Sequence, residues 1–96
     1  MESTKAKRYA VLDEFSQGQR ERLLYLEMHL WFSGVIGRRD LETRFGIKPA
    51  AASRDLAAYR ELAPTNLEYD TSDRCYRVAK AFHPVFEYAT DRVLSW

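Results

Sequence analysis

Apolar residues recur at helical spacing through the first third of the chain. Between residues 17 and 33 they fall in two adjacent stripes, which consist of Leu23, Leu26 and Leu30, and of Leu24, Met28 and Trp31. Ser16 and Gln19 have the spacing of a capping box, in which each side chain satisfies a backbone N–H at a helix start. We therefore expect a helix that begins at about Ser16 and ends at Gly34.

Two shorter helices are predicted on either side of a tight turn. Leu41 and Phe45 lie four residues apart in the segment 38–45, and Gly46 suits the left-handed conformation that ends such a helix. Ile47 follows the glycine, and its apolar side chain is expected to support the core from the turn. Pro49 fits the first position of a helix because its missing N–H has no partner there. A third helix should therefore run from Pro49 to about residue 62, where Pro and Asn favour a turn.

Strand patterns follow the third helix. Residues 67–70 and 75–78 alternate in polarity across a Thr-Ser-Asp-Arg link and predict a hairpin, whose inward residues should be Leu67, Tyr69, Tyr76 and Val78. Earlier, Val35 and Ile36 can form only a short strand. Residues 82–84 are expected to open a last helix with Phe86, Ala89, Val93 and Trp96 on one side. The chain stops inside that pattern, which favours a fragment of a longer protein.

This order of elements is that of a winged helix-turn-helix, a mostly α fold with a small β-hairpin whose third helix enters the DNA major groove. In that helix Ala52, Leu56 and Tyr59 fall on the core side, and Ala50, Arg54 and Ala57 point the opposite way. Small side chains would let the helix sit deep in a groove about 12 Å wide, with alanine methyls against thymine methyls. Alternatively, the alanines are good helix formers that allow close helix packing.

The expected DNA contacts come from three places along the chain. Arg54 could bind guanine in a bidentate manner, and Lys48 is better placed for a phosphate. Arg38 and Arg39 could clamp phosphates from the second helix, but they could equally form a solvated face or pair with Asp40 and Asp55. The whole predicted set is Arg38, Arg39, Lys48, Pro49, Ala50, Ala51, Ser53, Arg54, Ala57, Ser72 and Arg74.

The hairpin loop supplies two of these contacts. Ser72 and Arg74 would meet the DNA backbone or the minor groove from the tip of the hairpin. Asp70 and Asp73 make this wing less basic than a strong DNA wing would be. The sequence therefore leaves the role of the wing open between DNA contact and a solvated loop.

Composition changes this picture little. The chain has 96 residues, of which 46% are hydrophobic and 30% are charged, and no apolar run approaches the roughly 18 to 20 residues needed to cross a bilayer. No apolar leader opens the chain, so we expect a cytoplasmic protein that associates with the nucleoid and not with membranes. Cys75 is a single cysteine and excludes an internal disulfide or a cysteine-based zinc cluster.

Catalytic patterns are not evident in the sequence, and we expect no enzyme, no metal and no cofactor. His29 reads as a satisfied histidine at the rim of the core, and His83 before Pro84 reads as a cap of the last helix. The net charge is only +1, which is small for a nucleic-acid binder. It leaves a second function open, that of a winged-helix module for protein interaction or assembly without specific DNA binding.

Two stretches carry a family resemblance, "DLETRFGIKPAAASRDLAAYREL" and "NLEYDTSDRCYRV". Residues 22–86 resemble the N-terminal winged helix of bacterial WYL-type transcriptional regulators, and among these the BrxR/CapW-like repressors beside BREX and CBASS phage-defence operons. The resemblance implies a homodimer that binds an inverted-repeat operator at its promoter and represses it. At the positions of this sequence that match the family's motif, the resemblance implies a DNA-binding surface that consists of Lys48, Ala50, Ala51, Ser53 and Arg54.

Domain limits follow from the same resemblance. Residues 1–15 are expected to be an N-terminal arm or short helix, 16–78 the winged helix-turn-helix, and 79–96 a linker or dimerisation helix. The WYL domain of the family is absent from this sequence, so we expect no small-molecule ligand. Dimerisation could use a set of apolar residues that could equally cover the domain's own core, namely Leu24, Met28, Trp31, Phe86, Val93 and Trp96.

Overall fold

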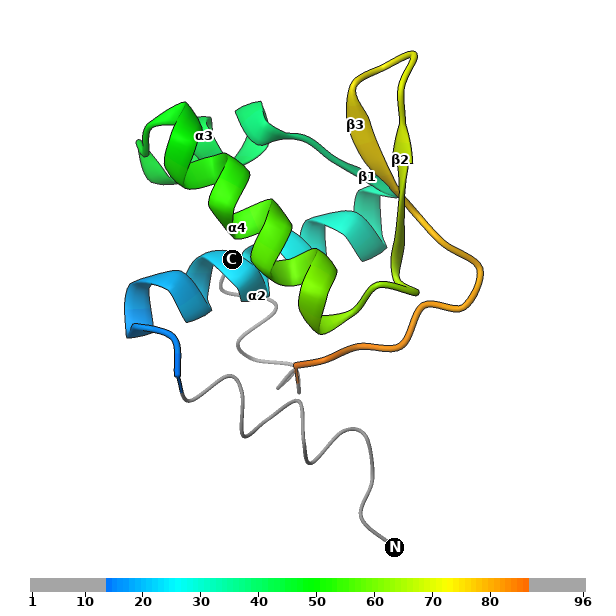
Figure 1. The fold of residues 1–96 in the computed structure, drawn as a ribbon, viewed down its shortest axis with the longest axis horizontal. Helices are drawn as coiled ribbons and strands as arrows, with labels where there is room; N and C mark the ends of the chain where they lie inside the picture. Colours follow the sequence, from blue (N-terminus) through cyan, green and yellow to red (C-terminus); the bar gives the residue numbers. More distant parts are fainter. Residues whose placement is uncertain (1–13, 87–96) are drawn as a thin grey trace, which may run out of the picture.

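The computed structural model describes residues 14–86, which form three helices and one small sheet (Figure 1). The elements in chain order are α2 (Gln17–Ser33), β1 (Val35–Ile36), α3 (Arg38–Phe45), α4 (Pro49–Leu62), β2 (Leu67–Asp70) and β3 (Cys75–Val78). These bounds confirm the predicted helices, the short strand and the hairpin. The predicted winged helix-turn-helix fold is correct.

Helix α2 begins and ends at the residues that the sequence indicates. The Ser16 hydroxyl accepts the backbone N–H of Gln19 at 3.1 Å, and Gly34 closes the helix with φ 82°. The second half of the predicted capping box is wrong. Gln19 turns its side-chain amide away from the helix start and donates to Asp55 Oδ1 at 3.2 Å. The Gln19 side chain is therefore held by a buried carboxylate on another helix.

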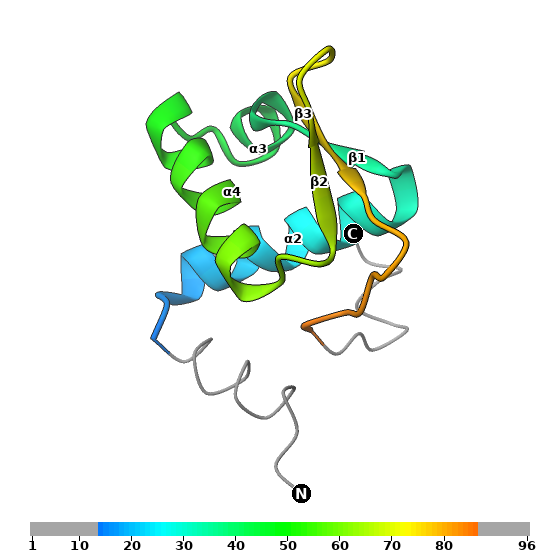
Figure 2. The same cartoon turned by 45° about the vertical axis from the view of Figure 1, so that its right-hand side comes forward.

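Helices α3 and α4 form the helix-turn-helix. Asp40 accepts the N–H of Gly37 at 2.7 Å at the start of α3, and Gly46 ends that helix with φ 64°. Ile47 then packs against the core, and Pro49 occupies the first turn of α4. Figure 2 shows α4 crossing in front of α2, with the sheet beside it. Each turn residue here acts locally, which is why the sequence alone predicted these ends.

The sheet has the strand order β1-β3-β2 and is antiparallel throughout. Val35 pairs with Arg77 and Ile36 with Tyr76, so β1 adds a third strand to the hairpin. Leu67 is buried and Val78 packs against the core, as predicted for the inner face.

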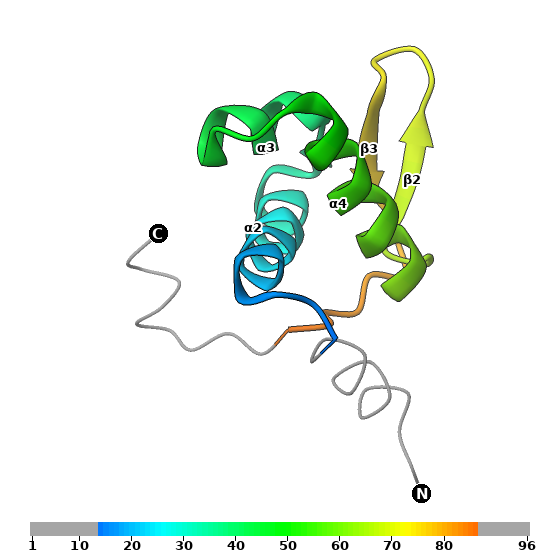
Figure 3. The ribbon, with the colours of Figure 1, turned by 60° about the vertical axis from the view of Figure 1, so that its left-hand side comes forward.

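Tyr69 lies on the predicted inner face of the hairpin, but it is not buried there. Its side chain is 49% exposed, although it shares the inner face with Leu67 two residues earlier. The reason is its place nearer the hairpin tip, which extends beyond the helices (Figure 3). There the Tyr69 ring meets the Tyr76 ring edge-on, with centroids 5.0 Å apart.

The apolar core lies between α2, α4 and the sheet. Its buried members come from α2, β1, α3, α4, β2 and the segments after α4 and β3, and they are Leu23, Leu26, Leu30, Ile36, Leu41, Ala52, Leu56, Tyr59, Ala63, Leu67 and Val85. The first apolar stripe of α2 and the predicted inner side of α4 are therefore confirmed. Burial of these side chains supplies the main driving force for folding.

A buried polar network crosses this core. Glu27 on α2 is fully buried and accepts the Tyr59 hydroxyl at 2.7 Å and the N–H groups of Val85 and Phe86 at 2.8 and 3.1 Å. Asn66, also fully buried, donates to the Tyr59 hydroxyl at 3.0 Å. The network ties the segment after β3 to both α2 and α4.

The predicted last helix does not open where the sequence placed it. Residues 82–86 are not helical, because their backbone groups bond to side chains of the core instead. His83 donates its N–H to Asn66 Oδ1 and accepts from Asn66 Nδ2, both at 2.8 Å. The rest of that predicted helix, with Ala89, Val93 and Trp96, lies outside the described residues, as does most of the predicted arm 1–15.

A buried ion pair attaches α4 to α2 at a second point. Arg22 donates to both carboxylate oxygens of Asp55, at 2.6 and 3.3 Å, and the Asp55 side chain is only 1% exposed. We expect Asp55→Ala to lower the free energy of unfolding by about 2 kcal/mol or more in urea denaturation. The loss stays below the about 3 to 5 kcal/mol typical of fully buried pairs because Arg22 keeps 23% exposure.

Two controls make this expectation specific. Glu61→Ala removes an exposed carboxylate from the same helix and should cost less than about 0.5 kcal/mol. The double variant Arg22→Ala/Asp55→Ala should cost less than the sum of its two single changes, since neither partner is then left alone. Strictly additive losses would show that the pair does not stabilise the fold.

Candidate nucleic-acid interface

The outward side of α4 is covered by small side chains and one long cation. Ala50, Ser53, Arg54 and Ala57 are exposed and Ala51 is half-buried, whereas the opposite side is buried against α2. The predicted division of this helix into a core side and a free side is therefore correct. A free side of this kind can approach another surface closely along its whole length.

Cations surround the start of this free side. Lys48 and Pro49 are exposed at the N-terminus of α4, and neither Lys48 nor Arg54 forms an ion pair within residues 14–86. Arg39 is likewise exposed and forms no ion pair there. Arg38 lies 3.5 Å from Glu42, a loose exposed pair of the kind that contributes little. The charges of these side chains remain available to an anionic partner.

The alternative pairing of Arg38 and Arg39 with Asp40 and Asp55 is wrong. Asp40 serves as the cap of α3, and its other oxygen lies 3.8 Å from His29 Nε2. Asp55 is held by Arg22 inside the domain. Both carboxylates are thus engaged elsewhere.

His29 has the role that the sequence indicated. Its Nδ1 lies 2.8 Å from the Val35 carbonyl oxygen, and its ring is half-buried beside the Tyr25 ring. Within residues 14–86 no group of three or more His, Cys, Asp or Glu side chains is arranged to hold a metal ion. No helix in that range has the length and apolar character needed to cross a membrane.

The hairpin loop carries its own charge compensation. Arg77 donates to Asp70 at 2.6 Å and to Asp73 at 2.5 Å. Asp70 also accepts the N–H groups of Ser72 and Asp73, at 2.9 and 3.2 Å. The two carboxylates that weakened the case for a basic wing are therefore paired. Arg74, with φ 53° in the left-handed region, stays exposed without an ion pair in the described part of the chain.

These contacts shift the pKa values of two side chains of the hairpin. The hydrogen bond from Arg77, followed by that from the Asp73 backbone, lowers the pKa of Asp70 below its ordinary value, and Asp70 raises the pKa of Arg77. A depressed carboxyl pKa contributes stability above the unfolded-state pKa of about 3.9, and this contribution is lost as the pH falls through the folded-state pKa. The loop pairing should therefore persist at neutral pH.

The other sequence-predicted residues are spread over several environments. Met28 is buried, Leu24 and Phe86 are half-buried, and Trp31 is exposed while packing on the ring of Phe82 at 5.4 Å. Val93 and Trp96 lie outside the described residues. A role of this set in dimerisation stays a prediction.

Several relevant residues were missed by the sequence analysis. Tyr69 lies exposed beside the loop, and Glu27, Asn66 and the Arg22–Asp55 pair set the position of α4 from inside. A charged residue within an apolar stripe, such as Glu27 between Leu26 and Met28, was the one available signal. It identifies a buried polar group without naming its partners.

We predict that Arg77→Gln raises the pKa of Asp70 towards its ordinary value. The variant removes the charged donor that favours the ionised carboxyl, and the pKa can be measured by NMR titration of the side-chain carboxyl carbon. Arg60→Gln, a change at an exposed arginine on α4, is the control and should leave the pKa of Asp70 unchanged. An unaltered pKa in Arg77→Gln would contradict the pairing.

Known repressors resemble most of the chain. It is 48% identical over 69 residues to the DNA-binding transcriptional repressor CapW of Escherichia coli strain KTE188, covering 72% of this chain and 23% of that repressor. The repressors of the same name from Pseudomonas aeruginosa and Stenotrophomonas maltophilia are 44% and 41% identical, over 81% and 71% of this chain and 26% and 23% of their own lengths. The chain thus spans about a quarter of the curated relatives it matches.

A family profile covers a still larger part of the sequence. Residues 18–96 match the profile described as the BrxR transcriptional regulator winged helix-turn-helix domain. The match includes all of the helix-turn-helix and the hairpin, and it agrees with the observed fold. The chain belongs to the family of BrxR transcriptional regulator winged helix-turn-helix domains.

Proposed function

We propose that this chain is the sequence-specific DNA-binding domain of a transcriptional repressor, which acts in the cytoplasm on the nucleoid. The observation that carries the proposal is the exposed side of α4, where small residues surround Arg54. The names of the related CapW proteins, which are DNA-binding transcriptional repressors, support it. The resemblance to repressors beside phage-defence operons suggests such an operon as the target.

In this proposal α4 enters the major groove. Ala50, Ala51 and Ala57 allow close approach and offer methyl groups to thymine methyls. Arg54 is the long donor on this side and can form two parallel hydrogen bonds to O6 and N7 of one guanine. The helix thereby combines an adaptable apolar surface with one directional contact.

Contacts to the DNA backbone would hold α4 in place. Lys48 and Pro49 lie where α4 begins, so that Lys48 and the free N–H groups of the first turn can meet a phosphate. Arg38 and Arg39 can reach phosphates from α3, and Ser72 and Arg74 from the hairpin. Such contacts position the protein on the duplex without reading its sequence.

The operator is expected to be an inverted repeat bound by a homodimer. Two copies related by a two-fold axis that coincides with the dyad of the operator would place their α4 helices one duplex turn apart, about 34 Å. The apolar set that contains Leu24 and Trp31 remains the proposed contact between copies, whereas Met28 of that set is buried within the domain. A module that only assembles with proteins would show no such spaced repeat.

We expect duplex binding to weaken steeply as the salt concentration rises. Each neutralised phosphate releases counterion, so log K should fall linearly with log salt, with a slope of about −0.9 per phosphate contacted. The duplex can be obtained by in vitro selection with the full chain from a random library and then titrated by fluorescence anisotropy. Failure to enrich any sequence and to bind duplex DNA at low salt would contradict the proposed function.

We predict that Arg54→Ala weakens binding to the selected duplex by about 1 to 3 kcal/mol and hardly changes binding to random duplex. The loss is specific because the guanine contact is absent from random DNA. Arg60→Ala is the matched control, since it removes the same charge from an exposed position at the far end of α4. An equal loss on both duplexes would reassign Arg54 to the DNA backbone.

A further inference from the structure

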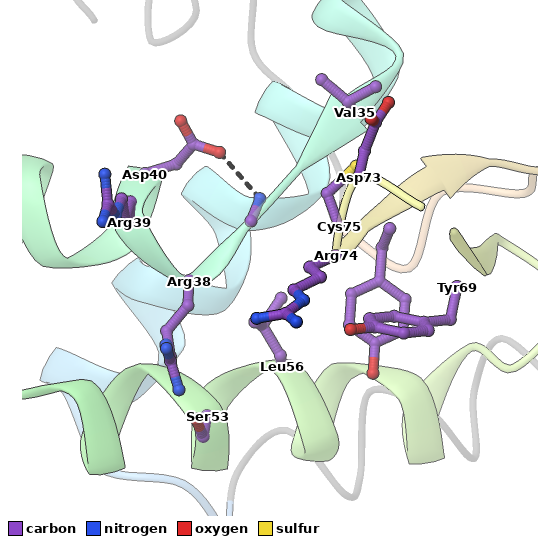
Figure 4. Close-up of a pocket in the computed structure, with 12 residues that line it drawn as sticks. Val35, Arg38, Arg39, Asp40, Ser53, Leu56, Tyr69, Asp73, Arg74 and Cys75 are labelled. Atoms are coloured by element: carbon purple, nitrogen blue, oxygen red, sulfur yellow. Dashed lines mark hydrogen bonds between the residues drawn. The ribbon is translucent and has the colours of Figure 1, made fainter. Parts of the chain in front are cut away.

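A cleft of about 770 Å³ opens between the start of α3, the middle of α4 and the hairpin (Figure 4). Arg38 reaches from α3 towards Ser53 on α4, and Arg74 points from the hairpin into the same space above Leu56. Three elements that are distant in the sequence thus bring two guanidinium groups and a hydroxyl group to one place. The cleft thus differs from the N-terminus of a helix, which offers an anion only backbone N–H groups.

Three arginines, Arg38, Arg39 and Arg74, line the cleft with two carboxylates, Asp40 and Asp73, so its formal charge is positive. Both carboxylates are already engaged by groups of the protein. Asp40 accepts the N–H of Gly37 at 2.7 Å, and Asp73 is paired with Arg77. Arg74 has no ion pair within residues 14–86, and Arg38 has only the loose contact to Glu42. The cleft therefore presents hydrogen-bond donors to a ligand and keeps few free acceptors.

Tyr69 extends this donor set. Its ring is held edge-on against Tyr76, while its side chain is 49% exposed and lines the cleft. Its hydroxyl has no hydrogen-bond partner among the described residues. The hydroxyl can thus donate to a group that enters the cleft, and the ring cannot easily turn away because Tyr76 packs against it.

A donor-rich cleft of this kind fits a phosphate better than a base. Base edges present both donors and acceptors, whereas a phosphodiester presents only acceptors and a negative charge. Arginine forms paired hydrogen bonds to such oxygens, and serine and tyrosine hydroxyls commonly contact them. The side chains that line the cleft therefore favour a ligand with several anionic oxygen atoms.

We infer that this cleft holds one phosphodiester of the DNA strand that separates the major groove under α4 from the minor groove under the hairpin. The inference rests on the proposed function, because a strand bordering the groove filled by α4 must pass between α4 and the adjacent hairpin. Arg38, Ser53 and Arg74 bind this phosphodiester, and Tyr69 donates to the same group or the next one. The site fixes how far α4 can slide along the groove.

Single methylphosphonate substitutions in the selected duplex test this site. Each substitution removes the charge of one phosphate, and the affinity of the full chain is measured for every position. One position in each half-site should lose about tenfold or more, as expected for a charge-assisted contact. Arg74→Gln should bind the unmodified duplex about tenfold more weakly, and its further loss at that one position should be clearly smaller than that of the unaltered chain, because only Arg38 and the hydroxyl groups still contact the phosphate there.

The controls separate this site from general charge attraction. Arg60→Gln removes a cation that does not line the cleft, and its loss should add to that of the methylphosphonate. Ser53→Ala and Tyr69→Phe, which keep the charge of the protein, should each reduce the effect at the same position or its neighbour. Circular-dichroism melting of each variant should match the unaltered chain, since all four side chains are exposed.

The outcomes are distinguishable. Additive losses for Arg74→Gln at every phosphate would overturn the cleft site and leave the proposed function intact, because the duplex is still bound. Coupling at positions that belong to two distant phosphates would also overturn it, since the cleft residues would then not share one group. Absence of duplex binding by the unaltered chain would overturn both proposals.

Discussion

Two polar pairs join the inner side of α4 to α2, and the exposed surface of α4 follows from them. Arg22 binds Asp55, and Glu27 accepts the Tyr59 hydroxyl one turn further along α4. Because a buried polar group without its partner costs more than the bond gains, these pairs strongly favour one rotation and one axial position of the helix. The apolar core alone would tolerate more sliding, since hydrophobic contacts are not directional.

The same placement of carboxylates explains how a nearly neutral chain presents a cationic face. The chain has 15 basic and 14 acidic residues. Glu27 and Asp55 are buried, Asp40 caps a helix, and Asp70 and Asp73 are paired with Arg77. The exposed cations Arg39, Lys48, Arg54 and Arg74 therefore form no ion pair within residues 14–86. The net charge of the whole chain does not show how its charged side chains are distributed over the surface.

Much of the fold is predictable because the helix ends depend on residues that act on their own backbone. The remainder is not predictable from the sequence because it depends on contacts between residues that are far apart along the chain. Gly46 and Pro49 act on their own backbone, so both helix bounds at the turn followed from the sequence. Gln19 shows the opposite case, because its partner Asp55 lies 36 residues away. Tyr69 had the correct face in the period-two pattern, but its exposure depends on how far the hairpin extends beyond the helices. The cleft, built from three elements, has no signature in any single segment.

The central claim is that the Ala50 and Arg54 side of α4 lies in the major groove. Intermolecular nuclear Overhauser effects between the chain and its selected duplex test this most directly. The account predicts contacts from the methyl groups of Ala50 and Ala57 to base protons and thymine methyls of the major groove. Contacts confined to the exposed aromatic residues Trp31 and Phe32, with none from α4, would contradict it.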